Sequence, residues 1–233
     1  MLGEKEQLTS GQIIASIIYL IIGPLLILFL SGDWGWVEGW IFDLGLIIVS
    51  VSSFIYLYRH DPALLVERFR KPGSGNQKTW DKYVVYLLAI GFWAWFFIMP
   101  LDAKRYEWSP AFPNGLKIFG GLVLLSSFFF LYRSFTDNTF LSPLVRIQSE
   151  RHQKVVSTGL YGFVRHPMYL GAICLFLGTP MLLGSLYGLL IGVLMSLLLI
   201  VRIRGEEQML VTELEGYEDY KMKVKYKLIP FVW

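Results

Sequence analysis

Chemically capable side chains gather in two stretches of this sequence, residues 148–169 and residues 202–207. The first stretch contains Arg165-His166-Pro167, and the second contains Arg202 and Glu206-Glu207. Arginine and histidine can hold a carboxylate or a phosphate, glutamate can bind an amine or ribose hydroxyls, and tyrosine can stack on a base. A zwitterionic nucleoside would use all of these groups, so the two stretches predict a pocket for such a ligand.

The same residues also have purely structural interpretations. Arg165-His166-Pro167 could be a basic membrane flank, with proline in the first helical turn, where its missing N–H costs nothing. Arg202 and Arg204 could be anchors that snorkel to the membrane interface. Glu206-Glu207 could be a solvated pair beside the membrane, and Tyr217 and Tyr220 could pack at the interface. The residue types alone leave both interpretations open.

Other common chemistries have little support in this sequence. Cys174 is the single cysteine, which excludes an internal disulfide and a cysteine-based zinc cage. No His-x-x-x-His spacing supports a metal site, and neither a Gly-x-Gly-x-x-Gly turn nor a P-loop is present. The net charge is only +3, and it is scattered. We therefore expect no metal and no nucleic-acid partner.

The elements that must position these residues are membrane helices. Apolar residues make up 55% of the 233 residues. Charged residues make up only 17%, whereas about 25% is usual in soluble domains. Lipid cannot hydrogen-bond an open backbone, so long apolar runs predict spanning helices. These runs cover residues 13–30, 41–58, 84–101 and 116–132.

The last apolar region, residues 168–201, has no charged residue and suits two short helices folded back on each other. The turn between them is expected either at 178–180 or at 184–185. The hairpin carries Gly184, Gly188, Gly192 and Ser196, a small residue at every fourth position. Such a ladder lets a neighbouring backbone approach closely. Helix packing is the favoured interpretation, a ligand-binding glycine face is the alternative, and the ladder also permits a homo-oligomer.

Basic residues are distributed unevenly between the two sides of the predicted helices. Eighteen of the 21 Lys and Arg residues fall in segments 1–12, 59–82, 133–167 and 202–233. The positive-inside rule makes these segments cytosolic, with both termini, and requires an even number of spans. The predicted fold is therefore all-α, a polytopic membrane protein of about six transmembrane helices whose last two form a tight helical hairpin.

The predicted topology divides the chain into two regions. Residues 1–133 form the N-terminal transmembrane helices, with about four spans. Residues 134–233 form a cofactor-binding catalytic region that contains the hairpin and a cytosolic tail. Because the two hairpin helices are short and turn back, the polar stretches that flank them meet on one membrane face. We expect the active site there, on the cytosolic side.

An ordered set of motifs spans residues 148–233. It consists of Val156-Ser-Thr-Gly-Leu-Tyr161, Arg165-His-Pro-Met-Tyr169, the glycine-rich hairpin, Glu206-Glu207, and Tyr217-x-x-Tyr220 before a basic run ending in Pro230. In these motifs the chain resembles the isoprenylcysteine carboxyl methyltransferase family. More broadly, it resembles the membrane methyltransferases that include phospholipid N-methyltransferases.

The resemblance implies S-adenosylmethionine as cofactor and a lipophilic small-molecule or prenylated acceptor that arrives through membrane lipids. Arg202 matches the family arginine that is assigned to the methyl-accepting substrate, and it is the expected catalytic residue. Residues four apart share a helix face, so Arg202 and Glu206 can point into one pocket. The implied cofactor site comprises Gln148, Gln153, Lys154, Val155, Val156, Gly159, Tyr161, His166, Pro167, Met168, Tyr169, Glu206 and Glu207.

The chain departs from the prenylcysteine enzymes near its end, where Lys223-Val224-Lys225 replaces their common Arg-Val-Pro. This departure leaves other acceptors open, including phospholipid amines and other small lipids that take a methyl group on nitrogen or oxygen. An NADPH-dependent membrane reductase of the sterol type is a rival class, in which Lys221, Lys223 and Lys225 could hold the 2′-phosphate. A non-catalytic membrane scaffold is a third class.

Overall fold

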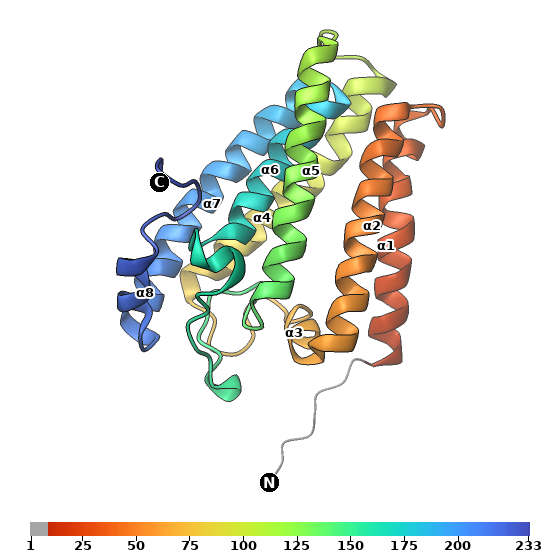
Figure 1. Ribbon diagram of the computed structural model, residues 1–233. Coiled ribbons are helices and arrows are strands. Elements are labelled where there is room, and N and C mark those ends of the chain that lie inside the picture. Colours follow the sequence, from red (N-terminus) through yellow and green to blue (C-terminus); the bar gives the residue numbers. More distant parts are fainter. Residues whose placement is uncertain (1–8) are drawn as a thin grey trace.

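The structure, a computed structural model, describes residues 9–233, and this part of the chain contains helices and no strand (Figure 1). The predicted all-α fold is confirmed. The long helices are α1 (Ser10–Ser31), α2 (Val37–His60), α4 (Thr79–Pro100), α5 (Asn114–Asp137), α6 (Pro167–Leu183) and α7 (Leu186–Glu213). The short elements are α3 (Pro62–Glu67), η1 (Leu101–Arg105), η2 (Ser149–Arg151), η3 (Gly159–Gly162) and α8 (Tyr217–Lys223).

Four of the described helices are long and apolar enough to cross a membrane, namely Val37–His60, Thr79–Arg105, Asn114–Asp137 and Leu186–Glu213. Ile18–Ser31 and Pro167–Leu183 are apolar but shorter. The polytopic membrane architecture is thereby supported, while the count of six crossings stays a prediction. Most of these helices extend beyond the apolar runs that predicted them, because Lys, Arg, Glu and Gln are good helix formers.

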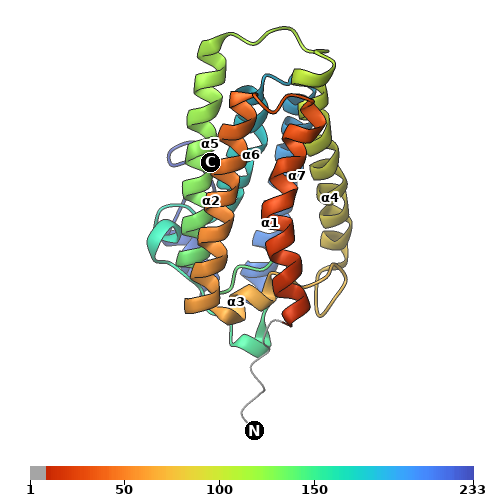
Figure 2. The ribbon, with the colours of Figure 1, turned by 90° about the vertical axis from the view of Figure 1, so that its right-hand side faces the viewer.

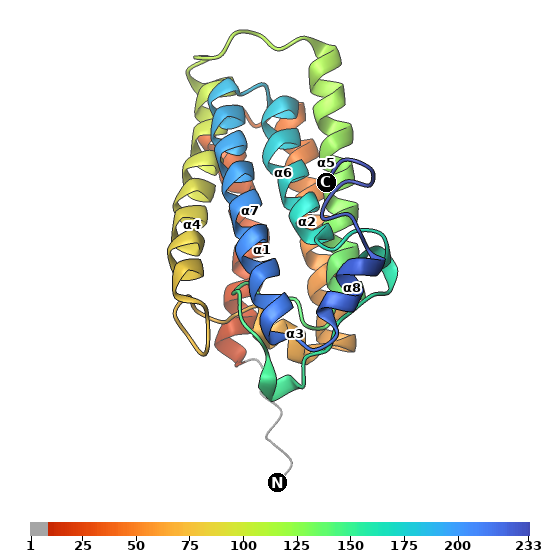
Figure 3. The same ribbon diagram turned by 90° about the vertical axis from the view of Figure 1, so that its left-hand side faces the viewer.

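The six long helices form a closed ring (Figure 2). Around this ring, α1 packs on α2, α2 on α5, α5 on α6, α6 on α7, α7 on α4, and α4 on α1. The short helices α3 and α8 and the loop after α5 all lie at one end of the ring (Figure 3). Residues from both halves of the sequence therefore meet at that end.

The turn between α6 and α7 lies at Gly184-Ser185, the second of the two expected positions. Gly184 has φ +85, a left-handed conformation that glycine adopts without steric cost. The Ser185 hydroxyl caps α7 by accepting from the Gly188 amide at 2.9 Å, and it donates to Asp102 at 2.6 Å. The alternative turn, residues 178–180, lies inside α6, which continues through Pro180.

Glycines allow the helices beside the turn to touch backbone to backbone. A Cβ added at Gly192 would collide with the Phe176 carbonyl of α6. At this position the small-residue ladder of α7 therefore packs against another helix of the same chain. Two glycines outside this ladder do the same between α5 and α6. A Cβ at Gly120 would lie 2.5 Å from the Leu182 nitrogen, and one at Gly178 would lie 2.7 Å from the Leu124 nitrogen.

Two adjacent glycines of α5 provide a matched test of this packing. Gly120→Ala is expected to destabilise the protein by about 1–3 kcal/mol, because the added methyl group must push α6 away. At Gly121 the nearest atom to an added Cβ is Leu182 Cδ1 at 3.6 Å, an ordinary contact. Gly121→Ala should therefore be neutral, or stabilising by up to about 1 kcal/mol through helix propensity. Thermal unfolding in detergent measures both, and equal effects at the two positions would contradict this packing.

Candidate active site

A cavity opens at the end of the helix ring where α3 and α8 lie, and its volume, measured out to the open mouth, is about 770 Å³. Its wall comes from the loop after α5, the start of α6, the C-terminal part of α7, and α8. The cavity thus lies between the two stretches that the sequence indicated. Nine of the predicted cofactor residues line it: Gln153, Lys154, Val155, Val156, Tyr161, His166, Met168, Tyr169 and Glu206.

The other predicted cofactor residues lie near the cavity but do not line it. Gln148 is fully buried, and its side-chain Nε2 donates to the Phe140 carbonyl at 2.6 Å. Gly159, in a left-handed conformation at φ +59, forms the turn into η3, and Pro167 begins α6. These residues shape the cavity wall through the backbone.

Glu206 and Glu207 differ in what they contact, although they are adjacent on α7. Consecutive residues of a helix point about 100° apart, so the two carboxylates can have different surroundings. Glu206 lines the cavity and accepts from the Tyr169 hydroxyl at 2.6 Å. Glu207 is buried outside the cavity wall and binds Arg165 Nε at 2.6 Å, Lys227 Nζ at 2.9 Å and His166 Nε2 at 3.3 Å.

Arg165 serves the structure of the C-terminal segment. Besides its ion pair with Glu207, its Nη1 donates to the carbonyls of Val224 at 2.6 Å and Lys225 at 2.8 Å. The backbone nitrogens of Arg165 and His166 donate to the carbonyls of Tyr226 and Lys227. This pairing fastens the chain after α8 against the start of α6, so the Arg165 guanidinium is occupied by groups of the protein itself.

Arg202 lies behind the cavity wall, paired with a carboxylate that the sequence analysis did not identify. Its Nε and Nη2 bind Asp81 at 2.7 Å and 3.3 Å, and its Nη2 also donates to the Pro143 carbonyl at 2.7 Å. The Arg202 Cζ lies 5.9 Å from the centre of the Tyr169 ring. Asp81 is fully buried in the first turn of α4, just before the apolar run. An acidic residue at that position was the only signal that could have indicated it.

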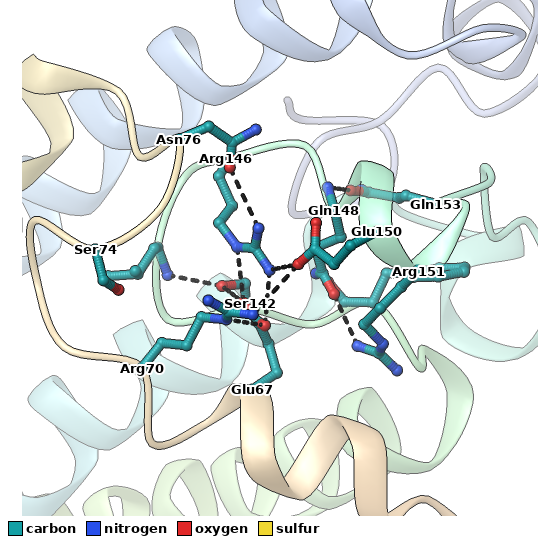
Figure 4. Close-up of polar contacts among 12 residues, drawn as sticks. Glu67, Arg70, Ser74, Asn76, Ser142, Arg146, Gln148, Glu150, Arg151 and Gln153 are labelled. Atoms are coloured by element: carbon teal, nitrogen blue, oxygen red, sulfur yellow. Dashed lines mark hydrogen bonds and ion pairs between the residues drawn. The ribbon is translucent and has the colours of Figure 1, made fainter. Parts of the chain in front are cut away.

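A second buried network holds the loop that forms one cavity wall (Figure 4). The Glu67 carboxylate, at the end of α3, accepts from Arg146 at 2.8 Å and 3.0 Å, from Ser142 at 2.6 Å and from Arg70 at 2.6 Å. Arg146 also binds Glu150 and Asn76. Ser142 and Arg146 line the cavity, so α3 positions part of its wall. No motif in the sequence indicated these residues.

The ionisation of Glu67 and of Tyr217 follows from burial and from hydrogen bonding. Burial works against the charge of Glu67, but hydrogen bonds from Arg146, Ser142 and Arg70 outweigh it and hold the pKa of Glu67 below the ordinary 4.5. Burial raises the pKa of Tyr217, so this cavity tyrosine is a neutral donor. Its hydroxyl is buried and has no hydrogen-bond partner among the described residues. Such an orphaned donor in a cavity wall fits an acceptor group of a ligand.

Comparisons with known proteins agree with the motifs. A family model described as phospholipid methyltransferase matches residues 115–215. A protein-S-isoprenylcysteine O-methyltransferase of Schizosaccharomyces pombe is 36% identical over 85 residues, covering 36% of this chain and 36% of that protein. A protein-S-isoprenylcysteine O-methyltransferase of Saccharomyces cerevisiae is 33% identical over 138 residues, covering 58% of this chain and 57% of that protein. A solved structure of the eukaryotic intramembrane Ras methyltransferase ICMT aligns with TM-score 0.47 and 19% identity, over 97% of this chain and 88% of that chain.

The fold and the cavity define an integral multi-pass membrane protein with a polar site at one end of its helices. Within that class the chain is similar to protein-S-isoprenylcysteine O-methyltransferases, and the resemblance predicted from the motifs is confirmed. The matched stretches span 36% to 57% of the length of these two curated relatives. The family match begins at residue 115, in α5, earlier than the motifs indicated, and it ends before Tyr217 and Tyr220.

The Glu67 network should make stability depend on acid. Because the pKa of Glu67 is lowered by folding, its contribution is complete above the ordinary value of 4.5 and is lost as the pH falls below it. Glu67→Gln is expected to cost about 1–3 kcal/mol near neutral pH. This difference from the wild type should shrink on acidification to about pH 3. Thermal unfolding across pH measures it, with the exposed Glu218→Gln as control; a difference independent of pH would contradict the assignment.

Proposed function

We propose that this protein is a membrane methyltransferase that transfers a methyl group from S-adenosylmethionine to a lipophilic acceptor bearing an isoprenylcysteine-like carboxylate. One contact carries the proposal, the 2.6 Å hydrogen bond from Tyr169 to Glu206. It joins the Arg165-His-Pro-Met-Tyr169 motif to the Glu206-Glu207 motif in the wall of one cavity. Relatives named as isoprenylcysteine O-methyltransferases support the same chemistry.

The cavity suits a cofactor of this kind. Its wall combines apolar and aromatic side chains with a few polar groups, which is the usual composition of a small-molecule site. Glu206 offers a carboxylate to an amine or to ribose hydroxyls, and the orphaned hydroxyl of Tyr217 offers a donor. His166, Met168 and the segment from Gln153 to Val156 also line the cavity. Gln148, Gly159, Pro167 and Glu207 support the site from behind.

When bound, S-adenosylmethionine supplies a methyl group on a sulfonium, and transfer to a carboxylate oxygen forms the ester bond while the methyl–sulfur bond breaks and leaves its electron pair on sulfur. The acceptor is already ionised, so the protein need not remove a proton. Its residues must hold the two reactants in attack geometry and exclude water. Arg202 would orient the acceptor carboxylate, because Asp81 and Pro143 fix its guanidinium, and no described residue accepts from its Nη1.

The proposed topology follows the distribution of charge. Six crossings by α1, α2, α4, α5, α6 and α7 would place both termini and the cavity on the cytosolic side, where 18 of the 21 basic residues fall. The cofactor would then enter from the cytosol, and the acceptor would enter from the bilayer between helices. Residues 1–133 would supply most of the spans, and residues 134–233 would supply the cofactor site.

A second candidate function is methylation of a phospholipid amine, which the description of the matching family model favours. The relatives found are methyltransferases, which does not favour a sterol-type reductase or a scaffold. Incubating membranes that contain the protein with methyl-labelled S-adenosylmethionine, and identifying the labelled lipid, separates the two methyl acceptors. Thermal shifts with S-adenosylmethionine, its demethylated product and NADPH test the cofactor, because a bound ligand stabilises the folded state.

The cofactor assignment predicts the effect of two substitutions. Glu206→Ala and His166→Ala should each weaken S-adenosylmethionine binding by about tenfold or more, the usual worth of a hydrogen bond to a charged group. Glu218→Ala, which removes an exposed carboxylate from neighbouring α8, should leave it unchanged. Isothermal titration of the purified protein measures the affinities. Unchanged affinity in both site variants would refute the assignment.

The role of Arg202 predicts a separation of turnover from cofactor binding. Arg202→Lys keeps the charge opposite Asp81 but loses the planar fork that orients a carboxylate. Turnover is expected to fall by about 100-fold, because a small misplacement of the acceptor is enough to do this. The dissociation constant of S-adenosylmethionine should change by less than about threefold. If turnover and S-adenosylmethionine affinity fell by similar factors, Arg202 would not be an acceptor residue.

A further inference from the structure

The segment after α8 ends in a closed apolar loop, residues 228–233, whose sequence Leu-Ile-Pro-Phe-Val-Trp contains no charged side chain. The Trp233 oxygen accepts from three consecutive amides, those of residues 227–229, at 2.9, 3.0 and 3.2 Å. The Val232 amide donates to the Ile229 carbonyl at 3.2 Å. The loop thus satisfies much of its own backbone, as a segment in contact with lipid must.

One side of this loop packs against the helix ring. Leu228 is buried and belongs to the main core cluster, and Trp233 packs against the same cluster. Lys227, directly before the loop, binds Glu207 at 2.9 Å, and its Nζ lies 4.8 Å from the centre of the Trp233 ring. These contacts fix the loop in one position on the outside of the helices.

The other side of the loop leaves large apolar side chains uncovered. Phe231 is 88% exposed, Val232 is 75% exposed and Ile229 is 47% exposed. Phe231 also has φ +66, a left-handed conformation that is unfavourable for a bulky residue. Water favours neither this exposure nor this conformation, so this side of the loop is suited to apolar surroundings.

The loop lies at the depth of the membrane-spanning helices. Its end lies alongside the long helices, farther from the cavity end than α8 (Figures 1 and 3). Val201 is 57% exposed at the last apolar turn of α7, and Glu207 follows six residues later, about 9 Å along the helix. Because Lys227 binds Glu207 and the loop continues from there toward the middle of the helices, its exposed side continues the lipid-facing surface of the protein.

Lysines precede the loop in the chain. Lys221, Lys223 and Lys225 are exposed, and no carboxylate of the described residues forms an ion pair with them. The acidic residues of α8, Glu218 and Asp219, lie in its first turn, so the lysines stand between these acids and the loop. A lysine beside a membrane lays its stem along apolar surface and places its charge among the headgroups. Anionic phospholipids attract such lysines.

We propose that residues 228–233 insert as an apolar loop into the bilayer leaflet at the cavity end, with Lys221, Lys223 and Lys225 on the headgroups of anionic phospholipids. The C-terminal segment is then part of the membrane-embedded surface and not a cytosolic tail. This inference goes beyond the proposed methyl transfer and does not depend on it. Because Lys227 joins the loop to Glu207 behind the cavity wall, the bilayer then helps to hold that wall in place.

A fluorophore at a single cysteine tests the insertion, with the full chain reconstituted in bilayer nanodiscs. Cys174→Ser removes the native thiol. Val232→Cys, Val201→Cys and Glu218→Cys then place the same dye on the loop, on the lipid-facing side of α7 and on exposed α8. Bromine on the acyl chains quenches a dye in lipid, and aqueous iodide quenches a dye in water. Position 232 should match position 201 in both measurements and lose the iodide quenching seen at position 218.

The opposite pattern would overturn the insertion. It consists of iodide quenching at position 232 as strong as at position 218, without quenching by brominated lipid. Ile229→Cys provides a second position on the same exposed side and carries the same expectation if Val232→Cys fails to fold. None of these measurements needs a methyl acceptor or S-adenosylmethionine, so their outcome is separate from that of the proposed function.

Spin-labelled lipids test the lysines in the same reconstituted protein. The wild type should associate more strongly with spin-labelled phosphatidylserine than with spin-labelled phosphatidylcholine. Glutamine at all three positions, Lys221, Lys223 and Lys225, should reduce this preference by about twofold or more. Lys71→Gln, which removes an exposed lysine from the loop before α4, is the control and should leave it unchanged. Equal association of the two lipids with the wild type, or a preference that survives the triple substitution, would overturn the contact with anionic headgroups.

Discussion

The buried carboxylate of Asp81 joins the three segments that form the rear of the cavity. It lies at the start of α4, binds Arg202 of α7, and accepts from the Val145 amide at 2.8 Å in the loop after α5. Gln77 donates to it from the chain before α4 at 2.7 Å. A charge removed from water must be paired and fully hydrogen-bonded, so these segments are stable only in the positions that satisfy this one carboxylate. Arg202 is held by the same requirement.

Two other buried carboxylates near the site are also paired with cations of the protein, and their role is structural. Glu207 binds Arg165, His166 and Lys227, and these contacts hold the C-terminal segment against the start of α6. Glu67 binds Arg146 and Arg70, and these contacts hold the loop after α5 against α3. With these carboxylates neutralised by the protein's own cations, Glu206 is left facing the cavity. Glu206 is therefore the carboxylate of this group that can bind a ligand.

Much of the fold was predictable because few backbone structures are stable inside a membrane. Apolar runs indicated where helices lie, and glycine followed by serine indicated one of two positions for the turn after α6. The length of α7 was not predictable from apolarity, because the helix continues twelve residues past Val201 through charged residues. Asp81 and Glu67 were missed for a related reason. Each is a single acid near the end of a helix, and its partners are distant in the sequence.

The sequence by itself determined which residue types could serve a zwitterionic nucleoside, and that two stretches flanking a short helical hairpin carry them. Spacing along one helix also indicated that Glu206 and Arg202 share a face. Tertiary structure decided which of those residues face the cavity, because that choice depends on partners from other helices. Glu207 and Arg165 have a structural role because they pair with each other. Asp81 fixes the position of Arg202.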